Sequence, residues 1–78
     1  MARFFFHVQD GSTFLDEEGT ELPDPNAARQ EAIRTCGEML RDVPWAINNG
    51  EPFRLWVTDQ PHGQGHTLFA LMVAAQSE

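Results

Sequence analysis

The chain has 78 residues, 41% of them apolar, and a formal net charge of −7 from twelve acidic residues and five arginines, with no lysine. This length predicts one domain spanning residues 1–78, and so short a chain buries only about 60% of its unfolded surface. The apolar content argues against a disordered chain. The single cysteine excludes an internal disulfide and a cysteine-rich zinc site. The scattered arginines argue against direct binding to nucleic acid or to an anionic membrane.

No targeting segment is recognisable. The opening residues, MARFFFHVQD, contain too short an apolar run for a signal peptide, and the longest apolar run, 68–75, is too short to span a membrane. With one free cysteine and no export signal, we expect a cytoplasmic protein. Negative charge keeps a small protein soluble and is also compatible with a basic protein partner.

Residues 3–9 predict a β-strand, because alternation places Phe4, Phe6 and Val8 on one face and residues such as Phe5 and His7 on the other. The next two residues, 10–11 (DG), fit a two-residue type I′ hairpin turn in which both central positions have positive φ. Residues 12–15 would form the returning strand. The acidic stretch 16–19 (DEEG) is interpreted as a solvated loop.

A helix is predicted over residues 25–42. Asp24 suits the N-cap because its carboxylate accepts hydrogen bonds from free N–H groups, and Pro25 suits the first turn, where a missing N–H costs nothing. Pro44 ends the helix. Gly37 at the edge of the apolar arc indicates a close approach of the helix to a sheet. The arc that would face this sheet holds Ala28, Ala32, Ile33, Cys36, Met39, Leu40 and Val43.

Two further strands are predicted after the helix. The segment 45–47 is an apolar connector and 48–50 (NNG) is a turn, after which residues 52–59 form a strand and residues 67–75 form the last one. The loop between them, 60–66, is rich in Gly and Pro. The order is β-β-α-β-β, which predicts an α+β fold: one helix packed on a small, mainly antiparallel four-stranded sheet.

One helix covers only one face of such a sheet. An antiparallel sheet with a wet second face alternates apolar with polar residues, and the last strand does not alternate. Contiguous apolar surface usually marks an interface. We therefore expect the second face, or the edge at the last strand, to contact another chain, most simply in a homodimer. Alternatively, the last strand is central and Trp45 folds over the open face. The expected interface residues are Phe5, Trp56, Phe69, Leu71 and Val73.

The acidic stretch 10–24 holds six acidic residues and raises the question of a cation site. A calcium loop starting at Asp10 would need a ligand at its fifth position and glycine at its sixth, where Phe14 and Leu15 stand. We therefore interpret the stretch as a connector whose acids favour the N-terminus of the following helix.

Other candidate chemistry is sparse. His62 and His66 could bind one metal from their loop, with His7 or the acidic loop as further ligands, but the sequence gives no sign that these groups converge. Cys36 lies in the apolar stripe and is expected to act as a small hydrophobe. No phosphate loop, nucleophile elbow or dinucleotide fingerprint is recognisable, so we predict no catalytic residue, no cofactor and no enzyme.

Three hypotheses for the function follow. The first is a non-enzymatic interaction or regulatory module that self-associates through its apolar face or last strand and binds a basic partner. The second is a small-ligand or metal-binding module that uses His7, His62, His66 and the acidic loop. The third is an acidic antitoxin-like or nucleic-acid-mimicking protein, a hypothesis that only the net negative charge supports.

Several motifs together resemble a short domain-of-unknown-function family of rhizobia and related α-proteobacteria. Members of that family open with an aromatic strand and an Asp-Gly turn, continue with an acidic D-x-x-G loop, a Leu-Pro-Asp helix entry and an Ala-rich helix, and close with a V-T-D element. The resemblance covers nearly the whole chain and implies the order of elements, and it implies no known activity. The matching segments here are Phe4–Val8, Asp10-Gly11, Asp16–Gly19, Leu22–Asp24, Ala27–Leu40 and Val57–Asp59.

Overall fold

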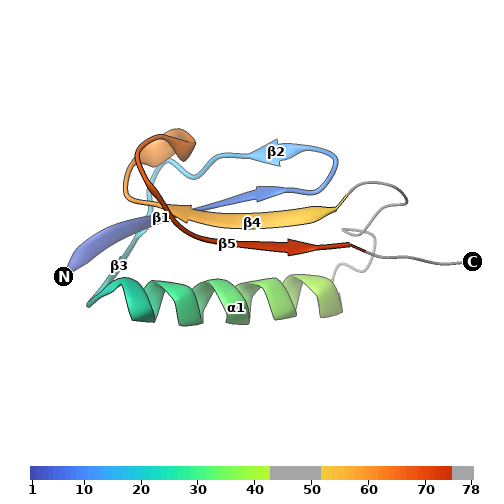
Figure 1. Cartoon of the computed structure of the whole chain (residues 1–78), viewed down its shortest axis with the longest axis horizontal. Coiled ribbons are helices and arrows are strands. Elements are labelled where there is room, and N and C mark those ends of the chain that lie inside the picture. Colours follow the sequence, from blue (N-terminus) through green and yellow to red (C-terminus); the bar gives the residue numbers. More distant parts are fainter. Residues whose placement is uncertain (43–51, 75–78) are drawn as a thin grey trace, which may run out of the picture.

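The structure, a computed structural model, describes residues 1–42 and 52–74. Figure 1 shows the helix along one face of the sheet, with the 3-10 turn η2 (Pro61–Gly63, orange) and the loop beside β2 (Thr13–Phe14) above the other. The predicted α+β fold, with one helix on a mainly antiparallel sheet, is confirmed, although the sheet has five strands and not four. The elements in chain order are β1 (Ala2–Gln9), β2 (Thr13–Phe14), β3 (Thr20–Leu22), α1 (Pro25–Asp42), β4 (Phe53–Thr58), the 3-10 turn η2 (Pro61–Gly63) and β5 (Thr67–Val73).

The sheet has the order β2-β1-β4-β5, and every pairing in it is antiparallel. The unpredicted strand is β3, which pairs with the first part of β1 and is too short to show alternation. Within the described residues, β5 is an edge strand that pairs with β4 alone. The predicted connector 45–47, its turn 48–50 and the helix stop at Pro44 lie outside the described residues.

The hairpin between β1 and β2 differs from the predicted type I′ turn. Gln9 pairs with Thr13, so the loop has three residues, and only Gly11 among them has a positive φ, at 101°. This register places Phe14 opposite Val8. Residues directly opposite each other in a sheet share a face, so Phe14 lies on the helix side.

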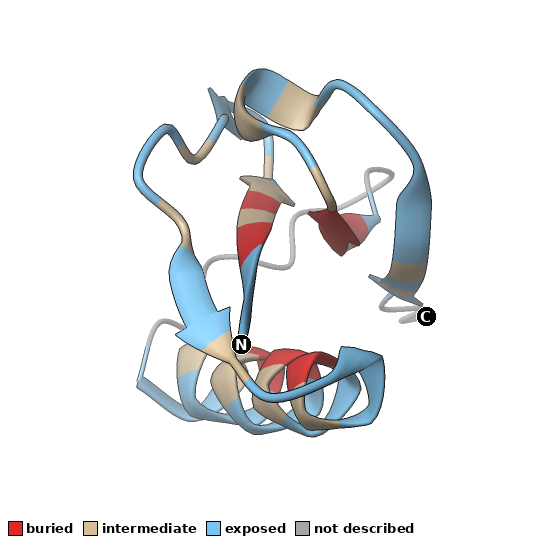
Figure 2. Cartoon of the chain, turned by 90° about the vertical axis from the view of Figure 1, so that its left-hand side faces the viewer, coloured by how far each residue is buried: buried red, intermediate tan, exposed pale blue. Residues whose placement is uncertain are grey.

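The helix begins where the sequence predicts, and its described part runs from Pro25 to Asp42. The N–H of Ala27 donates to Asp24 Oδ1 over 2.8 Å, which confirms the N-cap. Ala28 and Ala32 are buried against the sheet, and Figure 2 shows the buried turns on the sheet-facing side of the helix. Ile33, predicted in the same stripe, is instead 50% exposed.

Gly37 does not mark a close approach of the helix to the sheet. A Cβ built on it would meet no atom within 4 Å. The prediction for Gly37 is therefore wrong. The helix packs on the sheet instead through the small side chains of Ala28 and Ala32, which are 2% and 0% exposed.

The core lies between α1 and the inner face of β1 and β4. Phe53, Leu55 and Val57 of β4 are fully buried there. The register of β5 aligns these three residues with Val73, Leu71 and Phe69, respectively. All three β5 residues are partly buried and pack against this core, not on the second face.

The second face is covered in part by the chain itself. Phe5 and Trp56 are only 7% and 8% exposed. A Cβ on Gly19 would lie 2.8 Å from the Phe5 ring, and a Cβ on Gly63 would lie 3.9 Å from the Trp56 indole, so the loop at Gly19 and η2 cover these aromatic rings. The expectation of an uncovered second face is wrong at Phe5 and Trp56. The five expected interface residues therefore lie on two different faces.

Candidate functional site

A buried polar network lies on the second face, beneath those covering loops. It is formed by the side chains of His7 on β1, Thr58 on β4 and Asp16 in the loop between β2 and β3. His7 and Thr58 are fully buried. Because a buried polar group costs free energy unless it is hydrogen-bonded, the partners of each group decide what the network can do.

The Asp16 carboxylate collects backbone N–H groups from two segments. Oδ2 accepts from the N–H of Phe6 over 3.1 Å, between the parts of β1 that pair with β2 and β3. Oδ1 accepts from the N–H groups of Glu18 and Gly19 over 3.1 and 3.2 Å. The carbonyl oxygen of Asp16 also accepts from the N–H of His62 in η2 over 3.0 Å. Asp16 thus joins β1, its own loop and η2.

The hydrogen bonds of His7 fix its protonation state. Nδ1 accepts from the N–H of Asp16 over 2.9 Å, so Nδ1 carries no proton. The Thr58 hydroxyl donates to the carbonyl oxygen of Gln60 over 2.6 Å. Its oxygen is therefore left to accept from Nε2–H of His7 over 2.8 Å. His7 is a neutral imidazole with its proton on Nε2.

The pKa values of both groups follow from this geometry. Burial lowers the pKa of His7; the charge of Asp16 opposes that shift and the charge of His62 adds to it. For Asp16, burial would raise the pKa, but the N–H groups of Phe6, Gly19 and Glu18 together outweigh it, with His7 adding to them, and the pKa is lowered. Both shifts favour a neutral His7 beside a charged Asp16.

This network resembles a Thr-His-Asp relay only in its composition. A nucleophilic threonine needs a base that can take its proton, but here Nε2 of His7 already carries a proton and the Thr58 hydroxyl points to a carbonyl. The Asp16 carboxylate contacts the backbone, and the imidazole is bonded instead by the Asp16 N–H. The arrangement therefore fastens loops to the sheet and does not activate a nucleophile.

The histidines of the metal hypothesis do not form a site. Both ring nitrogens of His7 are engaged in the network. Nδ1 of His62 lies 3.8 Å from Oε1 of Glu17, and His66 donates its backbone N–H to Asp59. No group of three metal-ligating residues occurs in the part of the chain that the structure describes.

Cys36 lies on the other side of the sheet, in the core beneath the helix. Burial raises the pKa of its thiol, so the reactive thiolate is disfavoured. This agrees with the prediction of a small hydrophobe.

The acidic stretch divides into separate structural roles. Asp16 is engaged by three N–H groups, Glu21 pairs with Arg3 over 3.0 Å, and Asp24 caps the helix. Glu17 and Glu18 are exposed, as a solvated loop predicts. Asp16 is the exception, and the sequence reasoning missed it. The available signal was a histidine in an aromatic-rich strand followed nine residues later by an Asp-x-x-Gly loop.

The geometry defines a small α+β domain whose second sheet face is closed by loops tied to a buried histidine. The chain belongs to the DUF6894 family, a domain of unknown function whose model matches residues 3–74. Comparison with the curated proteins and with the solved structures found no match. Among the described residues, no helix is both long enough and apolar enough to cross a membrane.

Acid should weaken the fold through His7. Since its pKa is lower in the folded than in the unfolded state, where it is about 6.5, the unfolded chain binds the proton more readily. The stability from a neutral His7 is complete above pH of about 6.5 to 7 and is lost as the pH falls toward the folded-state pKa. Urea unfolding from pH of about 7.5 to 5 should show this slope, reduced in His7→Gln and kept in His66→Gln. A wild-type slope in His7→Gln would refute this assignment.

Proposed function

We propose that this protein is a non-enzymatic interaction module that self-associates as a homodimer through the edge of β5. The observation that carries the proposal is the unpaired edge of β5 in the described part of the chain. Its sequence, TLFALMV, has no charged residue and no proline. Natural proteins protect edge strands with charges, prolines or short lengths, because unpaired N–H and C=O groups recruit other strands.

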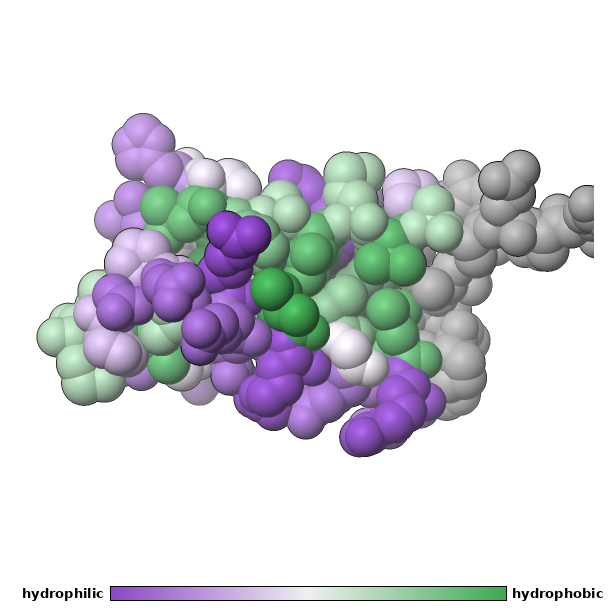
Figure 3. Space-filling view, turned by 60° about the horizontal axis from the view of Figure 1, so that its bottom comes forward, coloured by the Kyte–Doolittle hydropathy of each residue, from purple (hydrophilic) through white to green (hydrophobic). Residues whose placement is uncertain are grey.

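Apolar surface accompanies this edge. Leu68 and Met72 of β5 are 43% and 66% exposed, and Ile33 on the helix is 50% exposed. Figure 3 shows apolar side chains gathered in a band across the middle of the face where the helix comes forward, with hydrophilic side chains below it. Of the five interface residues expected from the sequence, three belong to β5 and remain part of the proposed interface: Phe69, Leu71 and Val73.

The occupant that fits this edge best is a second copy of the chain. The opposite edge of the sheet is built from the short strands β2 and β3, separated by the acidic loop 16–19. One open edge and one protected edge favour a closed twofold dimer over a growing fibre. Antiparallel pairing of β5 with its copy satisfies the free backbone groups of both chains.

The net charge of −7 makes the salt dependence diagnostic. Two copies repel each other, and salt screens that repulsion, so the dimer should tighten as salt rises. Binding to a basic partner, the other expectation from the charge, should weaken as salt rises. The antitoxin-like alternative rests on the same charge and predicts the same weakening.

The test is sedimentation equilibrium of the wild type and of Ala70→Lys. Ala70 is exposed at the middle of β5, where a twofold axis brings the two new charges together. We expect a dimer in the wild type and a dissociation constant raised by about tenfold or more in the variant. The control is Gln30→Lys, with the same charge change at an exposed helix position. A wild-type monomer at a concentration of about 1 mM, or equal dimers in both variants, would overturn the proposal.

The cellular setting is part of this proposal. The buried free Cys36 suits a reducing compartment, which supports the cytoplasm. The α-proteobacterial source follows from the resemblance described above and stays an expectation.

A further inference from the structure

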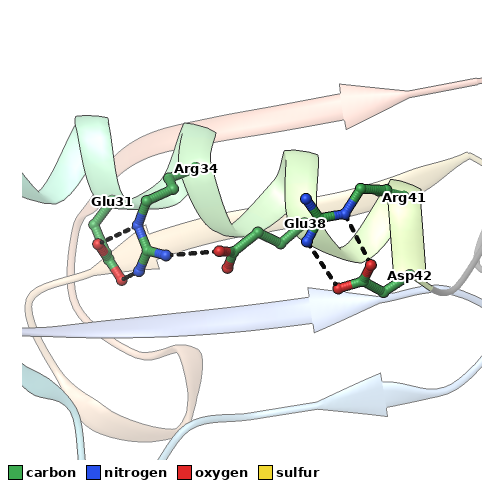
Figure 4. Close-up of polar contacts among 5 residues, drawn as sticks. All are labelled: Glu31, Arg34, Glu38, Arg41 and Asp42. Atoms are coloured by element: carbon green, nitrogen blue, oxygen red, sulfur yellow. Dashed lines mark hydrogen bonds and ion pairs between the residues drawn. The ribbon is translucent and has the colours of Figure 1, made fainter.

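Arginines in this acidic chain fall into two groups. Arg3, Arg34 and Arg41 form ion pairs with carboxylates, and Figure 4 shows those of Arg34 and Arg41 along the helix. Arg29 and Arg54 lie instead over aromatic rings, 5.1 Å from the Phe69 centroid and 4.3 Å from the Trp56 centroid. Neither has an acidic partner among the described residues.

Arg54 differs from Arg29 in lining a hollow. It is partly buried, whereas Arg29 is exposed. The hollow has a volume of about 320 Å³ and is lined by Gln9, Gly11, Pro52, Arg54 and Met72. Small-molecule sites begin at about this size and combine apolar walls with a few polar groups.

The sheet register explains why this hollow stays open. Gln9, Arg54 and Met72 stand side by side on β1, β4 and β5, in a row across the second face. The neighbouring row on that face contains His7 and Trp56, which the loops bury. Among residues 1–42 and 52–74, the loops end before the next row, so Arg54 lies at the boundary between covered and open surface.

We propose that this hollow binds a small organic acid by its carboxylate, with the apolar tail against Met72 and Pro52. Trp56 occupies one side of the guanidinium, with Arg54 Cζ 4.3 Å from the ring centroid. The N–H donors of the guanidinium suit a carboxylate in a bidentate pair. The Gln9 amide supplies a further donor. The nearly buried Trp56 holds the guanidinium plane in place. This site lies on a sheet face and goes beyond the proposed dimer, in which β5 pairs through backbone groups at its edge, although Met72 borders both surfaces.

The test uses butyrate as the probe, followed by NMR in salt of about 0.15 M, which screens the net negative charge. Saturable shifts are expected at the Arg54 side chain, the Gln9 amide and the Trp56 indole N–H, with a dissociation constant of about 1 to 10 mM for so small a ligand. Arg54→Gln should weaken butyrate binding by about tenfold or more, because it removes the charged guanidinium and its two parallel N–H donors.

The matched control is Arg29→Gln, which removes the other ring-stacked arginine and should leave butyrate binding unchanged. Arg54→Lys keeps the positive charge but lacks the paired N–H donors of the guanidinium, so it should bind butyrate more weakly than the wild type. This variant distinguishes a loss of carboxylate recognition from a loss of folding. The proposal is overturned if butyramide or inorganic phosphate binds as tightly as butyrate. It is also overturned if no saturable shift occurs, or if Arg54→Gln binds like the wild type.

Discussion

Replacing Asp16 by asparagine should lower the free energy of unfolding by about 2 to 3 kcal/mol, a large fraction for a small domain. The carboxylate accepts N–H groups with both oxygens, from Phe6 on one side and from Glu18 and Gly19 on the other. An asparagine has one oxygen, so in either orientation its NH2 group faces a backbone N–H. Urea unfolding followed by tryptophan fluorescence measures the change.

The control for this prediction is Glu18→Gln. It removes one negative charge two residues away, from an exposed side chain, and keeps the Glu18 N–H that Asp16 binds. We expect a change within about 0.5 kcal/mol. Equal losses in the two variants would mean that the loop charge matters and the hydrogen bonds of Asp16 do not.

Low pH gives a second readout of the same residue. Because the pKa of Asp16 is lowered in the folded state, its contribution is present above its unfolded pKa of about 3.8. The contribution is lost as the pH falls through the folded-state pKa. In Asp16→Asn this part of the acid sensitivity should be absent.

The second large effect is expected at Gly19, where alanine should lower the free energy of unfolding by about 2 to 4 kcal/mol. The φ of Gly19 is +75°, and an added Cβ would lie 2.8 Å from Arg3 Cγ, 2.8 Å from the Phe5 ring and 3.0 Å from the Phe4 carbonyl oxygen. The Arg3 stem can move, but the buried Phe5 and the β1 backbone cannot do so cheaply. The loop that closes the second face would have to lift.

Gly37→Ala provides the internal comparison, because the same substitution there should have the opposite sign. Gly37 lies within the helix, and its Cβ would meet nothing within 4 Å. Alanine should therefore raise the free energy of unfolding by about 0.5 to 1 kcal/mol. Thermal unfolding of the two variants should move the midpoint in opposite directions. A destabilised Gly37→Ala would contradict the absence of a close helix contact.

The loop closure links the two predictions to the proposed function. The polar network of His7, Thr58 and Asp16 ties the loop 15–19 and η2 to β1 and β4. The aromatic rings of Phe5 and Trp56 are therefore buried by their own chain. Exposed apolar side chains remain at β5, where Leu68 and Met72 are 43% and 66% exposed, and β5 is the edge proposed for a partner. Loosening the network in Asp16→Asn or Gly19→Ala should expose new apolar surface, which a hydrophobic dye would report.

Local sequence determined the helix and the strands of the core. Asp24 and Pro25 specify the start of α1 through groups that act within one turn, and these limits are confirmed. Alternation in β1 and β4 likewise predicted the inner face, because side chains in a strand alternate whatever the strand order. These features depend on neighbours a few residues apart, which is why a single sequence suffices to predict them.

Only the tertiary structure decided which face of β5 meets the helix and what covers the second face. Both faces of β5 are apolar, so its pattern is compatible with either register, and a shift of one residue exchanges the faces. The register shift between Val57 and Thr58 fixed the outcome and brought Phe69 and Leu71 to the core. Likewise, the bond between His7 and Thr58 joins residues 51 positions apart, and no local pattern records such a contact.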